Sequence, residues 1–256
     1  MNSWVNMIMG LPVAIHLPAA GPGTPAPPQV ERAFAHLRRA DEVFSPYRAD
    51  SVLNRHLRGE LPLPEAPPEF AQVLALCARA TVRTDGAFDA RACGTLDPSG
   101  AVKGWAAQGA AARLAARWPD YQLNAGGDVA LGSSASFWQI GLEHPTDSTG
   151  LLAVLSIGNG AVATSGTAHR GAHILDPVRG GAASGLVQAT VVGPDLTWAD
   201  IWATALCARG TRLLDPRDTL LARLEADGYQ AMFVTEDADL YRTTNFTGVI
   251  GQPSDA

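Results

Sequence analysis

Residues 104–131 have the sequence GWAAQGAAARLAARWPDYQLNAGGDVAL, in which the side-chain pattern changes at Pro119. The alanine-rich part before this proline predicts a helix over residues 104–118. After it, residues 121–131 have the apolar character and the flanking turn residues of a strand. The same division extends outward along the chain, since helical periodicity prevails before Pro119 and strand-like segments prevail after it.

Apolar residues at helical spacing predict further helices, and short apolar segments between turn residues predict further strands. The predicted helices span residues 30–43, 69–82, 104–118, 196–208 and 215–226. The predicted strands span residues 8–17, 121–131, 137–142, 151–157, 162–164, 186–192, 231–235 and 240–244, the last two as a hairpin around residues 236–239. Helices mainly in the first half and antiparallel or mixed strands mainly in the second indicate an α+β fold. No repeat or linker divides the chain, so residues 1–256 are expected to form one domain.

Composition places the chain among folded soluble proteins. Of its 256 residues 46% are hydrophobic and 17% are charged, with a net charge of −6, which disfavours disorder and argues against a nucleic-acid surface. No apolar run approaches the roughly 18 residues of a membrane span. The first nine residues do not resemble a signal peptide, and three widely spaced cysteines indicate neither a disulfide framework nor a zinc site. The expected compartment is the cytoplasm, with Cys77 and Cys207 buried.

Lys103 is the one lysine among 19 basic side chains, of which 18 are arginines. Codon bias explains an excess of arginine, yet a lone lysine can also mark a position where a guanidinium does not serve. It follows Gly100, which allows a ligand or metal to approach the backbone closely, near a predicted helix start. Neither this segment nor residues 124–128, where a glycine turn between strands is the simpler interpretation, matches a phosphate loop or a dinucleotide fingerprint.

Asp200 and Thr204 lie four residues apart in a predicted helix and therefore on one face of it. A carboxylate and a hydroxyl in the first turns of a helix are hard oxygen ligands suited to Mg²⁺ and its phosphate partners. The alternative is structural: Thr197 would cap the helix, Asp200 would occupy the third position, and Thr204 would bond back to a carbonyl. Spacing alone leaves both open.

His169 and His173 have the spacing of a metal-binding pair. A zinc helix would need glutamate where Arg170 stands, and Gly171 with the pair Asp176-Pro177 disfavours a long helix. One histidine acting as a general base is a better hypothesis than a histidine pair binding metal. A histidine that only makes a local hydrogen bond at a strand end is the alternative.

The order of these segments along the chain resembles the ApbE-like family of FAD:protein FMN transferases. Eight segments carry the resemblance: Met9-Gly10, FSPYRADS (44–51), DGAFD (85–89), LDPSGAVKGWA (96–106), NAGGD (124–128), ATSG (163–166), HILDP (173–177) and ADIWATAL (199–206). The resemblance implies a single α+β domain that binds FAD. It also implies an enzyme that uses Mg²⁺ to transfer FMN onto a Thr or Ser hydroxyl of a target flavoprotein, with release of AMP.

The resemblance further implies roles for individual residues. The residues expected to contact FAD are Met9, Tyr47, Ala87, Phe88, Asp89, Lys103 and His173. The metal would take the backbone carbonyl of Gly100 and the side chains of Asp200 and Thr204. His173 would be the acid/base residue near the pyrophosphate, with Lys103 as the second catalytic residue. Only residues 90–95 separate Asp89 from Leu96, where the family usually has a few tens of residues.

Two other functions use the same residues. In an FAD pyrophosphatase, water replaces the acceptor hydroxyl and the products are FMN and AMP. In a flavin-binding protein without catalysis, FAD stays intact. The presence of Asp200, Thr204 and His173 favours an enzyme, and transfer and hydrolysis share all three.

Overall fold

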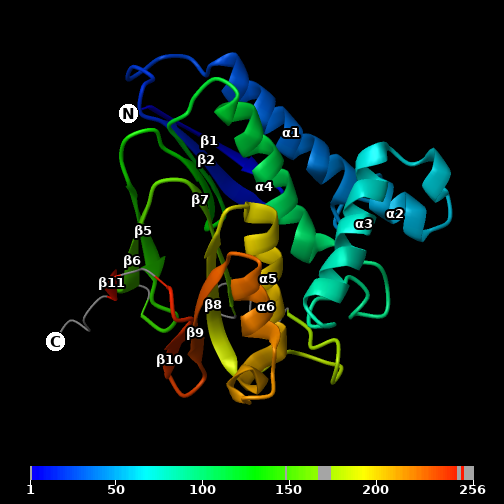
Figure 1. The fold of residues 1–256 in the computed structure, drawn as a ribbon. Coiled ribbons are helices and arrows are strands. Elements are labelled where there is room, and N and C mark those ends of the chain that lie inside the picture. Colours follow the sequence, from blue (N-terminus) through cyan, green and yellow to red (C-terminus); the bar gives the residue numbers. More distant parts are fainter. Residues whose placement is uncertain (1, 148, 167–173, 247–248, 251–256) are drawn as a thin grey trace.

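The chain forms three layers in a computed structural model that describes residues 2–147, 149–166, 174–246 and 249–250. A large sheet stands in the middle, with the helices on one side of it and a small sheet on the other (Figure 1). One apolar core fills the space between the helices and the large sheet. A second, smaller core lies between the two sheets.

Both sheets are antiparallel throughout their recorded strand pairs. The large sheet has the order β1 (Asn2–Ile8), β2 (Leu11–Leu17), β3 (Tyr121–Ala125), β4 (Asp128–Gly132), β7 (Gly160–Gly166), β8 (Leu186–Gly193), β9 (Gln230–Thr235) and β10 (Leu240–Arg242). The small sheet has the order β11 (Val249–Ile250), β6 (Leu151–Ile157) and β5 (Trp138–Glu143). The first hairpin thus joins the strands of the second half, through the pairing of β2 with β3. Antiparallel neighbours of this kind do not require the long crossover connection that parallel strands need.

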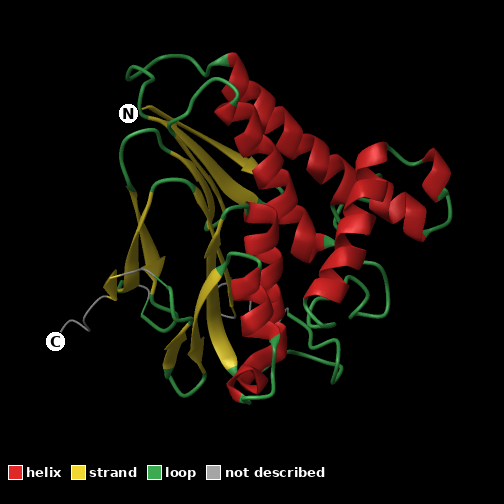
Figure 2. Cartoon of the chain, viewed as in Figure 1, coloured by secondary structure: helices red, strands yellow, loops and turns green. Residues whose placement is uncertain are grey.

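The helical layer is built on two long helices that pack together (Figure 2). These are α4 (Ser99–Ala115) and α5 (Leu196–Arg209), and α1 (Pro28–Phe44) packs on the other side of α4. The remaining elements are α2 (Val52–Leu57), α3 (Pro68–Arg83), α6 (Leu220–Ala226) and two 3-10 turns, η1 (Leu63–Glu65) and η2 (Gly210–Leu214). Nearly all of α5 is buried, because it lies between α4 and strands β7 and β8. Among the described residues, no helix is long and apolar enough to span a membrane.

The predicted α+β fold is confirmed, and so is the burial of Cys77 and Cys207. The strand predicted over residues 8–17 is confirmed as β2 from Leu11 onward, but its start is wrong: Met9 and Gly10, with positive φ angles of 54° and 70°, turn the chain back onto β1, which was not predicted. Only a left-handed turn reverses the chain there, and periodicity does not show one.

The segment predicted as one strand over residues 121–131 is two strands, and the glycine turn between strands interpreted within residues 124–128 is confirmed. Gly126 and Gly127, with φ of 61° and 99°, form the two-residue turn between β3 and β4. The helix predicted from residue 104 begins at Ser99, where the Asp97 carboxylate accepts a hydrogen bond from the Ser99 amide. The helix predicted from residue 215 begins at Leu220, because Asp215 and Asp218 hydrogen-bond nearby amides in a turn first.

Gly104 sets the distance between α4 and α5. A Cβ atom placed there would lie 2.7 Å from both the Asp200 Cβ and the Leu196 carbonyl oxygen. Because the glycine has no side chain, its amide can donate to Asp200 Oδ2 at 2.9 Å, so the backbone of α4 contacts a buried carboxylate on α5 directly. Helices approach this closely only at small residues.

We therefore expect Gly104→Ala to destabilise the protein by about 1–3 kcal/mol, because the added methyl forces the two helices apart. Helix propensity alone predicts the opposite sign, a gain of about 1 kcal/mol. Urea unfolding measures the change in the free energy of unfolding, provided that the dependence of this free energy on urea concentration is the same in both proteins. The control is Ala112→Gly on the exposed face of α4, which should lose about 1 kcal/mol through propensity alone. A Gly104→Ala protein as stable as the parent would contradict the close-contact explanation.

Candidate functional site

A cavity of about 180 Å³ opens where the first turns of α4 face α5. Segments from both halves of the chain line it. The lining comprises Ala87, Phe88, Asp89, Ala90, Ala92, Cys93, Asp97, Ser99, Gly100, Lys103, Ser165, Ile174, Leu175, Pro177, Asp200 and Thr204. One ammonium and three carboxylates stand among these side chains, so the cavity is suited to a cation and to groups that arrive with one.

The turn after α3 places one wall of the cavity. Thr84 is fully buried and ends the helix: its Oγ1 donates to the Ala80 carbonyl at 2.8 Å and accepts from the Phe88 amide at 2.9 Å. Gly86 follows with φ of 73°, a conformation that costs a glycine nothing. The chain therefore reverses within a few residues, and the Phe88 ring reaches the backbone of Gly100, where a Cβ atom would lie 3.1 Å from it.

Three charged side chains meet at the base of the cavity. Lys103 Nζ lies 2.7 Å from Asp128 Oδ2 and 3.5 Å from Asp200 Oδ1. Both carboxylates are buried, and each receives a backbone amide: Gly104 donates to Asp200, and Thr164 donates to Asp128 at 3.2 Å. Buried charges persist only when paired and hydrogen-bonded, so this cluster ties α4, α5 and β4 together.

The pKa of Asp200 is raised from 3.8 to about 7: burial raises it most, the Lys103 ammonium opposes this, and the neighbouring charge of Asp128 adds to the rise. A second carboxylate beside a buried one is the arrangement that keeps a proton, or attracts a cation, near neutral pH. A strongly perturbed carboxyl group in a cavity is also a marker of functional sites.

Asp200 and Thr204 offer hard oxygen atoms of the kind that Mg²⁺ takes as ligands. Thr204 lies one turn further along α5, with its Oγ1 3.3 Å from Ser165 Oγ, and the Gly100 backbone borders the same cavity. The residues that the structure describes contain no group of three or more His, Cys, Asp or Glu side chains placed to bind a metal. Mg²⁺ commonly takes one or two carboxylates and fills its other positions with water and phosphate oxygens, so the set present here suits it.

A second, larger cavity of about 610 Å³ lies between the two sheets. It adjoins the first, since Lys103 and Ser165 line both. Side-chain amides are frequent in its lining, namely Gln122, Asn124, Gln139 and Gln188. Sequence patterns could not identify this cavity, because its residues come from several strands and meet only when the sheets pack.

Seven of the predicted site residues line the first cavity together: Ala87, Phe88, Asp89, Gly100, Lys103, Asp200 and Thr204. Two others line neither cavity. Tyr47 is 95% exposed in the turn after α1, and Met9 is partly buried against the core in the β1–β2 turn. His169 and His173 lie outside the described residues.

The alternative in which Thr197 caps the helix that carries Asp200 is wrong. Asp195, not Thr197, caps α5, and its side chain accepts a hydrogen bond from the Trp198 amide at 3.1 Å. Asp200 instead accepts from Gly104 on the neighbouring helix.

Sequence reasoning also assigned no role to Asp128, whose segment was interpreted as a simple glycine turn. The sequence signal for a role was an aspartate directly after the glycine pair and before the apolar residues 129–131. In the structure this aspartate begins β4, which is buried throughout. Such a charge needs a buried partner, and only the packed structure identifies it as Lys103.

A family model and solved structures both relate this chain to ApbE proteins. The model of the ApbE family matches residues 9–95 and 90–226. No curated protein matches the chain.

Among solved structures, the ApbE protein of Thermotoga maritima has a TM-score of 0.80 at 20% identity, over 96% of this chain and 97% of its own. The flavin transferase ApbE of Vibrio cholerae has a TM-score of 0.78 at 20% identity, with the same two coverages. The apo form of the flavinyl transferase ApbE of Pseudomonas stutzeri has a TM-score of 0.74 at 22% identity, over 94% and 93%. At these identities the likeness shows the fold.

The raised pKa of Asp200 predicts a specific pH dependence of stability. Between about pH 4 and pH 7 the unfolded chain has lost this proton and the folded chain retains it. Folding is then favoured by acid. The contribution of Asp200 to the free energy of unfolding is therefore full below pH 4 and is lost as the pH rises through about 7. The steepest slope is about 1.4 kcal/mol per pH unit.

Denaturant unfolding of the metal-free protein across this range measures the effect. Asp200→Asn should remove this slope, because an amide does not titrate, and Asp237→Asn on an exposed turn is the control. Equal pH profiles for parent and Asp200→Asn would contradict the assignment.

Proposed function

The chain belongs to the ApbE family, and on this premise we propose that it is a Mg²⁺-dependent FAD:protein FMN transferase. It attaches FMN through a phosphoester to a Thr or Ser hydroxyl of a target flavoprotein and releases AMP. One observation carries the proposal: Gly100, Lys103, Asp200 and Thr204 line a single cavity. We also propose that residues 1–256 act as one domain in the cytoplasm.

The charge balance of the cavity supports a metal requirement. Among the described side chains that line it, Lys103 is the one cation and stands against Asp89, Asp97 and Asp200. A pyrophosphate brought into this field is repelled unless a further cation enters with it. Asp200, Thr204 and the Gly100 carbonyl would hold Mg²⁺, which, when bound, neutralises charge on the phosphate oxygens as the P–O bond breaks.

Lys103 is suited to contact the pyrophosphate beside the metal. Asp128 holds its ammonium at 2.7 Å, so the side chain is positioned before substrate arrives. An ammonium has three rotatable donors, which allows Lys103 to keep Asp128 and still donate to a phosphate oxygen. The two adjoining cavities leave space on either side of Lys103 for the two halves of a dinucleotide.

The acceptor hydroxyl requires a base, since an alcohol is a weak nucleophile at neutral pH. We propose His173 for this role from the family resemblance, because imidazole titrates near neutrality. Met9 and Tyr47 as further contacts of FAD have the same basis.

The test is incubation of the protein with FAD, Mg²⁺ and a candidate flavoprotein, followed by intact-mass measurement of that flavoprotein and chromatography of the nucleotides. We expect the target to gain the mass of an FMN phosphoester while AMP appears in equal amount. Free FMN and AMP without a mass gain would instead show hydrolysis, and intact FAD would show binding without catalysis.

Metal dependence has its own control in the same assay. A chelator should abolish transfer by the parent, and Asp200→Ala should be inactive with or without added Mg²⁺. Asp237→Ala, which changes an exposed carboxylate, should behave like the parent. Activity of Asp200→Ala in the presence of chelator would overturn the metal assignment.

Lys103→Arg tests why this position is a lysine. Arginine keeps the positive charge, but its planar guanidinium cannot take the place of a compact ammonium held by Asp128 and Asp200. We expect FAD affinity or turnover to fall by roughly tenfold, the effect of one displaced contact. Fluorescence titration with FAD and the transfer assay measure the two quantities. A Lys103→Arg protein that matches the parent in both would make the lone lysine a matter of codon usage.

A further inference from the structure

Two arginines at the end of α5 contact the loops that border the first cavity. Arg209 is the last residue of α5, and Arg212 follows within η2. Their side chains are only 11% and 23% exposed, and neither lines the cavity. A guanidinium this far from water needs several acceptors, so its partners indicate what it does.

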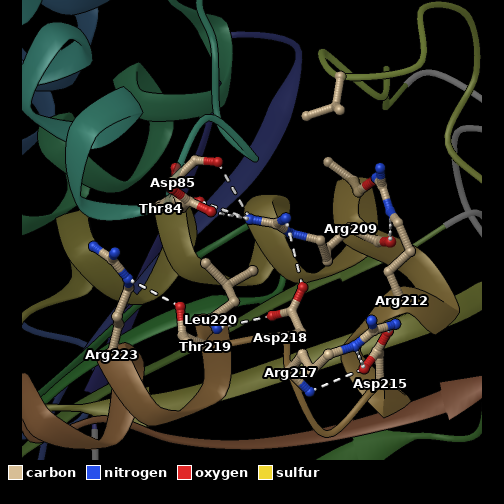
Figure 3. Close-up of polar contacts among 12 residues, drawn as sticks. Thr84, Asp85, Arg209, Arg212, Asp215, Arg217, Asp218, Thr219, Leu220 and Arg223 are labelled. Atoms are coloured by element: carbon tan, nitrogen blue, oxygen red, sulfur yellow. Dashed lines mark hydrogen bonds and ion pairs between the residues drawn. The ribbon is translucent and has the colours of Figure 1, made fainter.

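Arg209 joins α5 to the turn at the end of α3. Its Nη2 donates to the carbonyl oxygens of Thr84 at 3.3 Å and Asp85 at 3.2 Å. A cation is favoured at the C-terminal carbonyls of a helix, where the dipole is negative. Its Nη1 lies 3.5 Å from the carboxylate of Asp218, which is itself buried to a similar degree. Figure 3 shows the guanidinium between Thr84 and Asp85 on one side and Asp218 on the other.

The turn that Arg209 holds carries a wall of the cavity. Asp85 has a φ of 51°, a left-handed conformation that costs a non-glycine residue about 1 kcal/mol or more. Such a conformation persists when the surrounding contacts impose it. Ala87, Phe88 and Asp89 follow directly and line the cavity. The bonds to the Thr84 and Asp85 carbonyls therefore fix the point from which this wall begins.

Arg212 holds a second loop that lines the cavity. Its Nη2 donates to Asp176 Oδ2 at 2.7 Å, and the other oxygen of Asp176 accepts from the amides of Val178 and Arg179 at 3.0 and 3.2 Å. Burial raises the pKa of Asp176, but the hydrogen bonds from Arg212 and the two amides outweigh it and lower that pKa below its ordinary value. The carboxylate thus stays charged and keeps the loop turned.

The same loop lines the cavity through Ile174, Leu175 and Pro177. Its far end packs directly against η2: a Cβ at Gly185 would lie 3.0 Å from the Thr211 amide nitrogen, and a Cβ at Gly210 would overlap the carbonyl oxygen of Ser184. The loop is therefore held to the end of α5 by both an ion pair and backbone contact.

We propose that Arg209 and Arg212 are positioning residues for FAD, which hold two walls of its cavity to one helix. The proposal rests on the proposed function. Asp200 and Thr204 project from that same helix, so both loops and the metal-binding side chains are fixed to a single rigid element. Loss of either arginine should loosen the contacts to FAD and leave Asp200 and Thr204 in place.

The experiment is fluorescence titration of the full chain with FAD, using Arg209→Met and Arg212→Met. Methionine keeps much of the side-chain length and removes every donor. We expect the dissociation constant for FAD to rise by roughly tenfold or more in each, as small misplacements of a binding wall do. Arg217→Met is the matched control, because Arg217 lies in the same region, is 90% exposed and pairs with Asp215 rather than with either loop.

A second readout separates positioning from plain loss of stability. Partial unfolding lowers the amount of protein that binds FAD and the apparent kcat, but leaves KM for FAD in the folded fraction unchanged. Positioning raises KM for FAD more than it lowers kcat. Arg209→Lys should recover part of the affinity, because an ammonium can still donate to the Thr84 and Asp85 carbonyls.

The two proposals fail differently. If the parent binds FAD and both methionine variants bind it with the parent's dissociation constant, the positioning roles are wrong and the proposed function stands. If the parent does not bind FAD, the proposed function is wrong and the positioning roles fall with it. A raised dissociation constant in Arg217→Met equal to that of the other two would also overturn the inference, since it would show a general effect of lost charge.

Discussion

The buried cluster of Lys103, Asp128 and Asp200 is the constraint on which the rest of the structure depends. Two carboxylates and an ammonium removed from water are tolerated only with close pairing and backbone donors, and both are present. Satisfying them requires α4, α5 and β4 to meet at one point. Gly104 makes this possible, because any side chain there would separate the helices and break the hydrogen bond to Asp200.

The same cluster gives the cavity charged groups that a gap in apolar packing would lack. A buried carboxylate beside another carboxylate has a raised pKa and a high affinity for a proton or a metal ion. Removing these charges from water carries a desolvation penalty, which their pairing and the backbone donors offset. The helix that presents Asp200 and Thr204 is rigid and almost wholly buried, so the geometry of the site follows from the core.

The comparisons show that this fold is kept at low sequence identity. Structures only 20–22% identical to this chain superpose over at least 94% of it. The family model matches in two parts that overlap at residues 90–95, the short connection between Asp89 and Leu96. In this chain the connection is a compact turn in which the Asp97 amide donates to the Ala90 carbonyl at 2.7 Å. The walls of the cavity on either side of it are thereby brought close with few residues.

The sequence was sufficient to predict the α+β class and the helices α1, α3 and α5, and to place Asp200 and Thr204 on one face of α5. These features depend on periodicity and i,i+4 spacing, which are properties of neighbouring residues. The sequence was sufficient too for the glycine turn within residues 124–128, but not at Met9 and Gly10, where a left-handed turn interrupts an otherwise strand-like pattern.

Only the tertiary structure decided the pairing of Lys103 with Asp128, the cavity between the sheets, and the contacts of Arg209 and Arg212 with separate loops. Each of these joins residues from different elements. Their energies come from burial and from distances between elements, which no local pattern encodes. The lone lysine was visible in the sequence, but its position between two buried carboxylates exists only because α4, α5 and β4 pack together.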